Sequence, residues 1–309
     1  MNGLQILGLG HAVPDRVVTN DELARTVDTS DEWIVSRTGI RERRFAAEDE
    51  SNASLASRAA TRAIECAGID KNDIAFCVVA TFTPDLWAPA TASRVAQMLA
   101  LPEHTVAFDM NGGCTGFVYA LTAAHGLLAA HGGEYALVIG SEIISRMADM
   151  TDRSTCVLFG DGAGAAVVRL SPDHPFCFSG GGRPDETVLY CPIERGIRMD
   201  GSEVYRFATV IVPQCIQSVL SKSGKTLDDV HHIVCHQANA RIIEQAARRL
   251  GVDADRFYLN LQRYGNTSAA SIPLALSEMR DEGLLTPGKT VVCAGFGAGL
   301  TYGAMLLTF

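Results

Sequence analysis

The chain alternates short apolar runs with segments in which apolar positions recur at helical spacing. Runs such as Ala75–Ala80 and Ala163–Leu170 have the length and continuous apolar character of buried strands. The segments Ser54–Cys66 and Val210–Ser221 instead place their apolar residues on one face of a helix. This alternation predicts an α/β fold in which helices cover sheets with largely parallel strand pairing.

The sequence also repeats itself. Three pairs of segments match in the same order at a spacing of about 155 residues, although identity within each pair is low. The pairs are Ala67–Ile74 with Ser223–Val230, Glu134–Gly140 with Lys289–Gly295, and Asn111–Cys114 with Asn266–Ala269. A common order and spacing predict a chain built from two duplicated halves.

The predicted division falls near the end of the apolar run Ala163–Leu170. Residues 1–172 form the expected N-terminal half and residues 173–309 the expected C-terminal half. Residues 173–200 are rich in Pro, Gly and Asp, so we expect an irregular connection there.

Composition narrows the class of protein. Hydrophobic residues make up 47% of the chain and charged residues 20%, as in compact globular proteins. A net charge of −9 disfavours a nucleic-acid-binding surface. No apolar run reaches about 18 residues, so we expect no membrane-spanning helix. The N-terminus has no positively charged start followed by a long apolar stretch, so we expect no signal peptide. Nine cysteines without a C-x-x-C pair then indicate free thiols in a reducing cytoplasm.

Cys114 is the most informative residue. It follows an apolar strand that ends near Asp109, comes directly after Gly112-Gly113, and precedes a helical pattern over Thr115–Ala130. Unpaired backbone N–H groups at a helix start favour the thiolate form, which is the nucleophile. The glycine pair would let a substrate carbonyl approach the backbone. The alternative is a small buried hydrophobic residue.

His236 follows the apolar segment Ile233–Cys235, at the end of a strand where α/β folds place their sites. A hydrogen-bonded structural histidine is the alternative. His231, His232 and Cys235 lie close by in sequence, but their spacing fits no standard zinc pattern, so we expect no metal.

Asn266 precedes a helix over Ile272–Glu282. An asparagine there is usually a cap, but its repeat partner is Asn111, just before the cysteine. The Gly-rich turns Gly160–Gly164 and Gly295–Gly299 suit backbone donors to an oxyanion. Residues 283–290 match a P-loop string, but they follow a helix and open a strand, which is the wrong order for a P-loop.

Together these segments resemble the β-ketoacyl-acyl-carrier-protein synthase III family of the thiolase superfamily, over essentially the whole chain. Thr29–Ile40 (TSDEWIVSRTGI), Phe159–Gly164 (FGDGAG) and Gly295–Gly299 (GFGAG) belong to the same match. The resemblance implies a thiolase-like five-layer α-β-α-β-α fold of two similar halves, and a homodimer.

The resemblance also implies a mechanism without metal or redox cofactor. Cys114 would be acylated by an acyl-CoA, and malonyl-acyl-carrier protein would then lose CO2 and attack the acyl-cysteine. His236 and Asn266 would hydrogen-bond the malonyl thioester oxygen, and the backbone N–H groups of Cys114 and Ala298 would form the oxyanion hole.

Further residues are carried over by the resemblance in groups. The implied CoA-binding residues are Thr29, Trp33, Arg37, Arg153 and Asn239. The implied carrier-protein patch comprises Arg241, Arg248 and Arg249 on the helix after His236, joined by Arg206. Phe296 and Ala88 are assigned to the acyl pocket, Ala88 through the partner subunit.

Five positions depart from the family pattern. Gly112-Gly113 stands where Ala-Ala is common, Ala298 where glycine is, and Ser202 where a CoA-contacting asparagine often is. Ala88 stands where family members restricted to short acyl chains carry a bulky aromatic residue. The small side chain leaves room for longer or branched starter acyl groups, unless Leu86 or Trp87 fills the space.

We weigh three functions. The first is a condensing enzyme that starts fatty-acid synthesis from acetyl-CoA or a similar short acyl-CoA, and the retained Asn266 favours it. The second is a same-fold condensing enzyme or acyltransferase of secondary metabolism. The third is a non-catalytic CoA- or carrier-binding protein, which the complete set Cys114, His236 and Asn266 disfavours.

Overall fold

The computed structural model describes residues 3–193 and 196–309. Two sheets form its frame. The first is made by residues 3–171 and has the strand order β1-β7-β6-β4-β5. Its strands are β1 (Gly3–Ala12), β4 (Ile74–Ala80), β5 (Val106–Met110), β6 (Tyr135–Glu142) and β7 (Gly162–Ser171). The second has the order β11-β12-β13-β8. Its strands are β8 (Cys177–Asp185), β11 (His232–Cys235), β12 (Thr290–Gly297) and β13 (Gly299–Thr308).

The two sheets share one topology. In the first sheet β4 pairs in parallel with both β5 and β6, and in the second β11 pairs in parallel with β12. The strands that follow are antiparallel (β7 and β1, β13 and β8). The sheets are therefore mixed, not largely parallel as expected. Ala298 alone joins β12 to β13, and a connection that short forces the two strands to run antiparallel.

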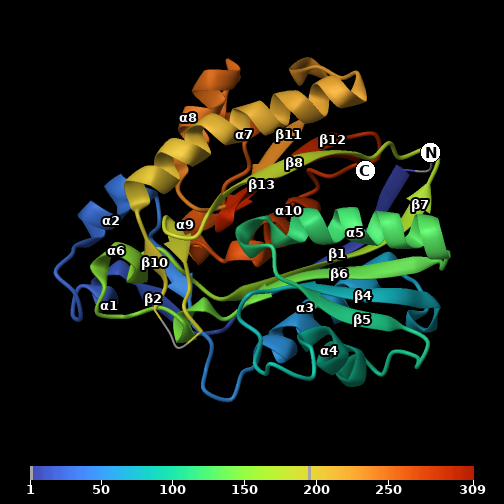
Figure 1. The fold of residues 1–309 in the computed structure, drawn as a ribbon, viewed down its shortest axis with the longest axis horizontal. Helices are drawn as coiled ribbons and strands as arrows, with labels where there is room; N and C mark the ends of the chain where they lie inside the picture. Colours follow the sequence, from blue (N-terminus) through green and yellow to red (C-terminus); the bar gives the residue numbers. More distant parts are fainter. Residues whose placement is uncertain (1–2, 194–195) are drawn as a thin grey trace.

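Helices cover both sheets and fill the space between them, so that five layers alternate (Figure 1). One outer layer holds α3 (Asn52–Ala67) and α4 (Thr91–Leu99), and the other holds α7 (Gly201–Ser223) and α8 (Ala240–Leu250). The middle layer holds α5 (Gly116–His131) and α10 (Ser271–Asp281), one from each half. Apolar side chains of both central helices and both sheets form one core cluster.

The remaining elements are short. They are the strands β2 (Val17–Thr19), β3 (Glu42–Arg44), β9 (Leu189–Tyr190) and β10 (Arg198–Met199), the helices α1 (Asn20–Leu23), α2 (Asp31–Thr38), α6 (Arg153–Cys156) and α9 (Leu261–Tyr264), and the 3-10 turns η1 (Lys71–Asp73), η2 (Gly113–Thr115), η3 (Ile144–Arg146), η4 (Leu227–Asp229), η5 (Ala254–Arg256) and η6 (Ser268–Ala270).

The halves interlock because glycines let backbones approach closely. A Cβ on Gly140 of β6 would lie 2.2 Å from the carbonyl oxygen of Ala269, in η6 of the other half. A side chain at position 140 would therefore push the second half off the first sheet.

The stretch 173–200 is more regular than expected. It contains β8, which pairs with β13 along an outer edge of the second sheet, and the short pair β9 and β10. The strand was missed because Gly180, Gly181 and Gly182 interrupt β8, and glycine has low strand propensity.

One segment passes a length and apolarity test for a membrane span. It is Gly113–His131, which comprises η2 and α5. Seven residues of α5, including Phe117 and Leu121, are buried in the middle layer of the fold. The apolar character of this helix is explained by packing between two sheets.

Candidate active site

Cys114 lies in η2, between the end of β5 and the start of α5. The expected strand, Gly-Gly-Cys and helix order is present. Gly113 has φ of 52°, in the left-handed region that glycine tolerates, so the turn places Cys114 at the start of the helix. Cys114 is half-buried and lines a cavity of about 1540 Å³.

The end of β12 approaches Cys114 from the second half. A Cβ on Gly297 would lie 2.8 Å from the Cβ of Cys114 and 3.2 Å from its sulfur. Only glycine fits there without displacing the thiol. The next residue, Ala298, lines the same cavity.

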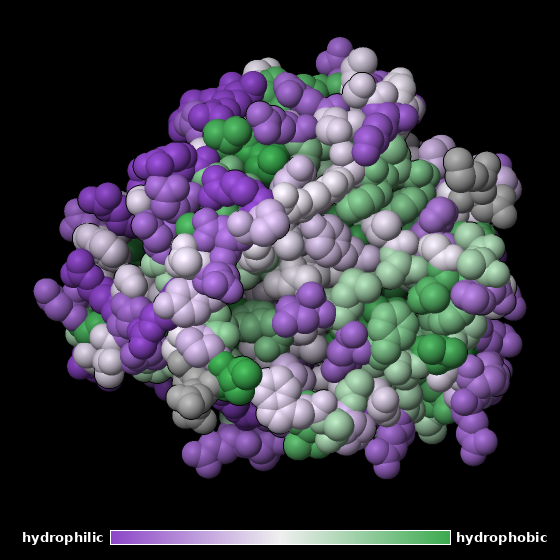
Figure 2. All heavy atoms as spheres, in the orientation of Figure 1, coloured by the Kyte–Doolittle hydropathy of each residue, from purple (hydrophilic) through white to green (hydrophobic). Residues whose placement is uncertain are grey.

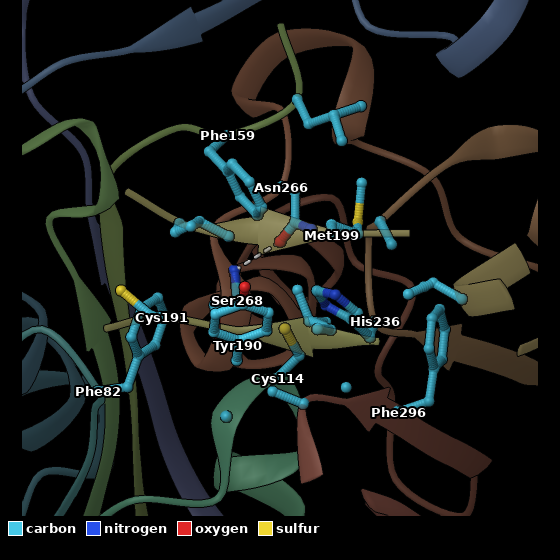
Figure 3. Close-up of a pocket in the computed structure, with 18 of the residues that line it drawn as sticks. Phe82, Cys114, Phe159, Tyr190, Cys191, Met199, His236, Asn266, Ser268 and Phe296 are labelled. Carbon is cyan, nitrogen blue, oxygen red and sulfur yellow. Dashed lines mark hydrogen bonds between the residues drawn. The ribbon is translucent and has the colours of Figure 1, made fainter. Parts of the chain in front are cut away.

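His236 follows β11 directly and is 1% exposed. Its backbone N–H donates to the carbonyl of Ala294 on β12 at 2.8 Å. Its Nδ1 lies 2.8 Å from the Oγ of Ser271, and its ring meets Phe296 edge to face at 5.2 Å between centroids. These contacts fix the ring beside Cys114 (Figure 3).

Asn266 is held by backbone hydrogen bonds to the first half. Its N–H donates to Leu158 at 2.8 Å, and its carbonyl accepts from Gly160 at 3.0 Å. Its Oδ1 accepts the N–H of Ser268 at 2.9 Å, which fixes the amide orientation, because a backbone N–H needs an oxygen partner. Within the described chain the amide nitrogen makes no hydrogen bond, so it remains a donor to the cavity.

The three side chains therefore reach one cavity from both halves. Figure 3 shows the sulfur of Cys114, the ring of His236 and the amide of Asn266 facing the same space. In the whole molecule, the surface is hollowed near the centre of the view, by the start of α5 (Figure 2).

Several residues of the site escaped sequence reasoning. Ser268 and Ser271 stand in the Asn266 segment that was read as a helix cap, and only their spacing after Asn266 could have signalled a role. An apolar wall comes partly from the stretch expected to be irregular. Its members include Phe82, Phe159, Leu189, Tyr190, Cys191, Ile197 and Met199.

Burial decides the charge state of the nucleophile. It raises the pKa of the Cys114 thiol to about 12, against the smaller lowering effect of the nearby Ser268 hydroxyl, and the Glu142 carboxylate raises it further. Burial thus opposes the thiolate form that the helix start favours, because desolvation of the sulfur is the larger effect.

The alkylation rate of Cys114 should report this pKa. We expect its rate with iodoacetamide to rise about tenfold per pH unit from pH 7 to 10, because only the thiolate reacts and the pKa lies above that range. Mass spectrometry of the Cys114 peptide measures the rate. A plateau below pH 9 would show that the thiolate is already formed.

A buried carboxylate anchors the loop beside the site. Glu142, at the end of β6, accepts hydrogen bonds from the hydroxyls of Thr81 and Thr83 at 3.0 and 2.6 Å, and from the N–H groups of Phe82 and Thr83. Burial nonetheless raises the pKa of Glu142 to about 8. The anchored segment leads into residues 84–87, which line the cavity.

Comparisons with known proteins identify the family. The family model for 3-oxoacyl-[acyl-carrier-protein] synthase III matches residues 108–179, and its C-terminal model matches residues 220–309. The β-ketoacyl-[acyl-carrier-protein] synthase III of Clostridium acetobutylicum is 43% identical, over 99% of each chain. The chain belongs to the 3-oxoacyl-[acyl-carrier-protein] synthase III family.

Solved structures of this family agree with the fold. The synthase III of Aquifex aeolicus VF5 superposes with a TM-score of 0.96 at 40% identity, over 99% of this chain and 100% of that one. The priming β-ketosynthase of the R1128 polyketide biosynthetic pathway gives 0.92 at 34% identity, over 99% and 96%. The predicted thiolase-like fold is confirmed, and the chain is a condensing acyltransferase.

The residues expected to hold CoA in this synthase III chain fall into two groups. Arg37 and Asn239 line the cavity. However, Asn239 caps α8 through Arg241 N–H at 2.9 Å and donates to the Arg37 carbonyl at 3.0 Å, so both ends of its amide are engaged. Trp33 and Arg153 pack together, with the guanidinium 4.8 Å from the ring centroid, outside the cavity lining.

Thr29 also lies outside the cavity lining, and its hydroxyl is buried without a hydrogen-bond partner among residues 3–193 and 196–309. For the acyl pocket, Phe296 lines the cavity and is 2% exposed. Ala88 is exposed in the loop before α4 and does not line the cavity of a single chain.

The four arginines of the expected carrier patch are all exposed along α7 and α8. Arg206 pairs with Glu203 at 2.6 Å, and Arg241 lies over the ring of Tyr205 at 5.6 Å. Both border the cavity, whereas Arg248 and Arg249 lie further along α8. Figure 2 shows hydrophilic surface gathered over α8 and α2 at the upper left.

Other sequence features have structural explanations. Residues 282–289 connect α10 to β12, so the P-loop-like string runs from a helix into a strand. All nine cysteines are free thiols. In the described part of the chain, no group of three or more His, Cys, Asp or Glu residues is arranged to hold a metal ion. His231 instead accepts the N–H of Thr290 at 3.1 Å.

Proposed function

We propose that this enzyme condenses a short acyl-CoA, such as acetyl-CoA, with malonyl-acyl-carrier protein, and so starts fatty-acid synthesis in the cytoplasm. The observation that carries the proposal is the convergence of Cys114, His236 and Asn266 on one cavity from two halves of the chain. The names of the relatives agree with this reaction.

Each side chain has one role in the proposed reaction. The sulfur of Cys114 attacks the acyl-CoA carbonyl, and CoA leaves as its thiol. Malonyl-acyl-carrier protein then loses CO2, and negative charge gathers on its thioester oxygen. The free N–H of Asn266 and the ring of His236 hydrogen-bond that oxygen. The amide of Asn266 is a donor fixed in advance, which is effective because it needs no reorganisation during the reaction.

The backbone N–H groups of Cys114 and Ala298 are proposed to hold the oxyanion of the acyl-transfer steps. Nothing in this sequence of steps requires a metal or redox cofactor, since the malonyl carboxylate itself leaves as CO2. The CoA nucleotide is proposed to bind at the Trp33 and Arg153 pair, where an aromatic face and a guanidinium meet.

The deciding experiment follows the mass of the intact protein. An acetyl adduct is expected after mixing with acetyl-CoA, and malonyl-acyl-carrier protein should discharge it as a 3-oxoacyl-carrier product. If no acyl-CoA in a series of increasing chain length leaves an adduct, the covalent mechanism is wrong.

A same-fold enzyme of secondary metabolism is the second candidate, favoured by the 34% identity to the priming β-ketosynthase. It predicts an adduct that malonyl-acyl-carrier protein cannot discharge, or a preference for another acyl group. The same mass experiment separates the two candidates.

The carrier protein is proposed to dock on the arginines of α7 and α8, because carrier proteins are acidic. We expect Arg249→Glu to raise KM for malonyl-acyl-carrier protein about tenfold, through repulsion at the docking surface. Acylation by acetyl-CoA should not change. Arg169→Glu, an exposed arginine on β7, is the matched control. Equal KM values in both variants would rule out this docking surface.

A homodimer is proposed to form through β5. This strand is the outermost of its sheet, and Val106 is 53% exposed there, with Trp87 82% exposed in the preceding loop. An unpaired edge with apolar side chains is a template for pairing with a second copy. Light scattering should give twice the 33.0 kDa chain mass. Val106→Asp should yield monomer, whereas Val17→Asp, an exposed valine on β2, should not.

A further inference from the structure

The hydroxyl of Ser271 lies at the centre of a buried hydrogen-bond network behind His236. Ser271 is 2% exposed, at the first position of α10. Its Oγ lies 2.9 Å from the carbonyl oxygen of Ser268, 2.8 Å from Nδ1 of His236 and 3.3 Å from the backbone nitrogen of Gln237.

The chemistry of these partners fixes the protons. A carbonyl oxygen can only accept, so the single hydroxyl proton of Ser271 points to Ser268. A backbone N–H can only donate, so Gln237 occupies one lone pair of the hydroxyl oxygen. The remaining lone pair faces Nδ1 of His236, which must therefore carry a hydrogen.

This assignment leaves Nε2 as the ring nitrogen that is bare when His236 is neutral. Asn266 is opposite in character, because Ser268 takes its oxygen and leaves its N–H free. The site thus offers one fixed donor and one fixed acceptor, although the proposed decarboxylation uses a hydrogen bond from both.

We propose that Ser271 is a positioning residue that holds His236 with its proton on Nδ1, so that Nε2 acts as a proton shuttle for the sulfur of Cys114. This inference rests on the proposed function, in which Cys114 is acylated and then released.

The proton balance closes over both half-reactions. Nε2 takes the thiol proton as the sulfur bonds to the acyl carbon, and the departing CoA sulfur receives that proton when its bond to carbon breaks. The condensation step consumes one proton overall. Nε2–H, loaded from solution, donates to the malonyl thioester oxygen and finally protonates the Cys114 sulfur as the new carbon–carbon bond displaces it.

The surroundings of His236 limit its imidazolium form to a transient state. In the described part of the chain, its ring contacts the hydroxyl of Ser271 and the ring of Phe296, which are both uncharged, and it lines the same cavity as Cys114. Burial lowers the pKa of His236 to about 3. The imidazolium therefore forms only beside a negative charge, which the thiolate or the malonyl group supplies.

Nitrogen NMR of the enzyme without substrate tests the assignment directly. With 15N-labelled histidine, and the His236 signal assigned through His236→Gln, we expect the shift pattern of a neutral ring with hydrogen on Nδ1 and a bare Nε2. Hydrogen on Nε2 would overturn the proposal, whether or not the enzyme condenses acetyl-CoA. The NMR result therefore tests the position of the hydrogen on His236 even if the proposed function is wrong.

Ser271→Ala is the second test. It should give a mixture of both tautomers and slow acylation by acetyl-CoA at least about tenfold, by analogy with the loss of the orienting partner of a metal-binding histidine. Ser271→Thr, which keeps the hydroxyl, should restore the native NMR pattern.

Ser277→Ala is the matched control. Ser277 lies on the same helix and hydrogen-bonds Nδ1 of His11 at 2.9 Å, outside the cavity. Its variant should leave the His236 signal and acylation unchanged. If Ser271→Ala also leaves both unchanged, the serine has no role in the shuttle.

Discussion

Replacing Cys114 with alanine is expected to abolish the acetyl adduct and to lower the condensation rate at least about 1,000-fold, because no other group in the proposed mechanism can form the covalent intermediate. Intact-mass spectrometry detects the adduct, and release of 3-oxoacyl-carrier product measures the rate. Fold integrity can be checked in the same samples by circular dichroism.

The cavity holds a second thiol that provides the control for this variant. Cys191 is half-buried and lines the same cavity. Cys191→Ser should retain the adduct, and peptide mapping should place it on Cys114. An acetyl adduct that persists in Cys114→Ala would show that another residue is the nucleophile.

Replacing Asn266 with alanine is expected to separate the two half-reactions. The acetyl adduct should still form, but decarboxylation of malonyl-acyl-carrier protein should slow roughly 100- to 1,000-fold, the usual cost of losing one donor to a developing oxyanion. Release of CO2 from labelled malonyl-carrier protein measures that step.

Asn266→Asp sharpens this test. Aspartate keeps the oxygen that accepts the Ser268 N–H at 2.9 Å, so the local turn should survive, but it lacks the N–H that faces the cavity. Decarboxylation as slow as in the alanine variant would assign the effect to the lost donor. Full activity in either variant would remove Asn266 from the mechanism.

Local patterns in the sequence predict an α/β fold of two halves and single out three residues as candidates, whereas the thiolase-like fold and the roles of these residues are implied by the resemblance to the family. A cysteine between a strand and a helix, a histidine at a strand end, and an internal repeat that pairs Asn111 with Asn266 are all visible in one dimension. The repeat in the sequence corresponds to two sheets with the same topology.

What the sequence could not supply depends on contacts between distant segments. The neutral Cys114 thiol results from burial by both halves, which outweighs the helix end beside it. The bond between His236 and Ser271 joins residues 35 positions apart. The strand β8 stayed hidden because a glycine run lacks the side chains that mark a strand, and only pairing with β13 defines it.

The approach of β12 to Cys114 has a consequence for synthesis on the ribosome. Cys114 is translated well before Gly297 and Ala298, which enclose its thiol in the folded chain. Until then, α5 has no second sheet to cover it. In the proposed mechanism, a nascent chain that still lacks His236 and these two residues carries the cysteine without its catalytic partners, and it is not acylated by acyl-CoA.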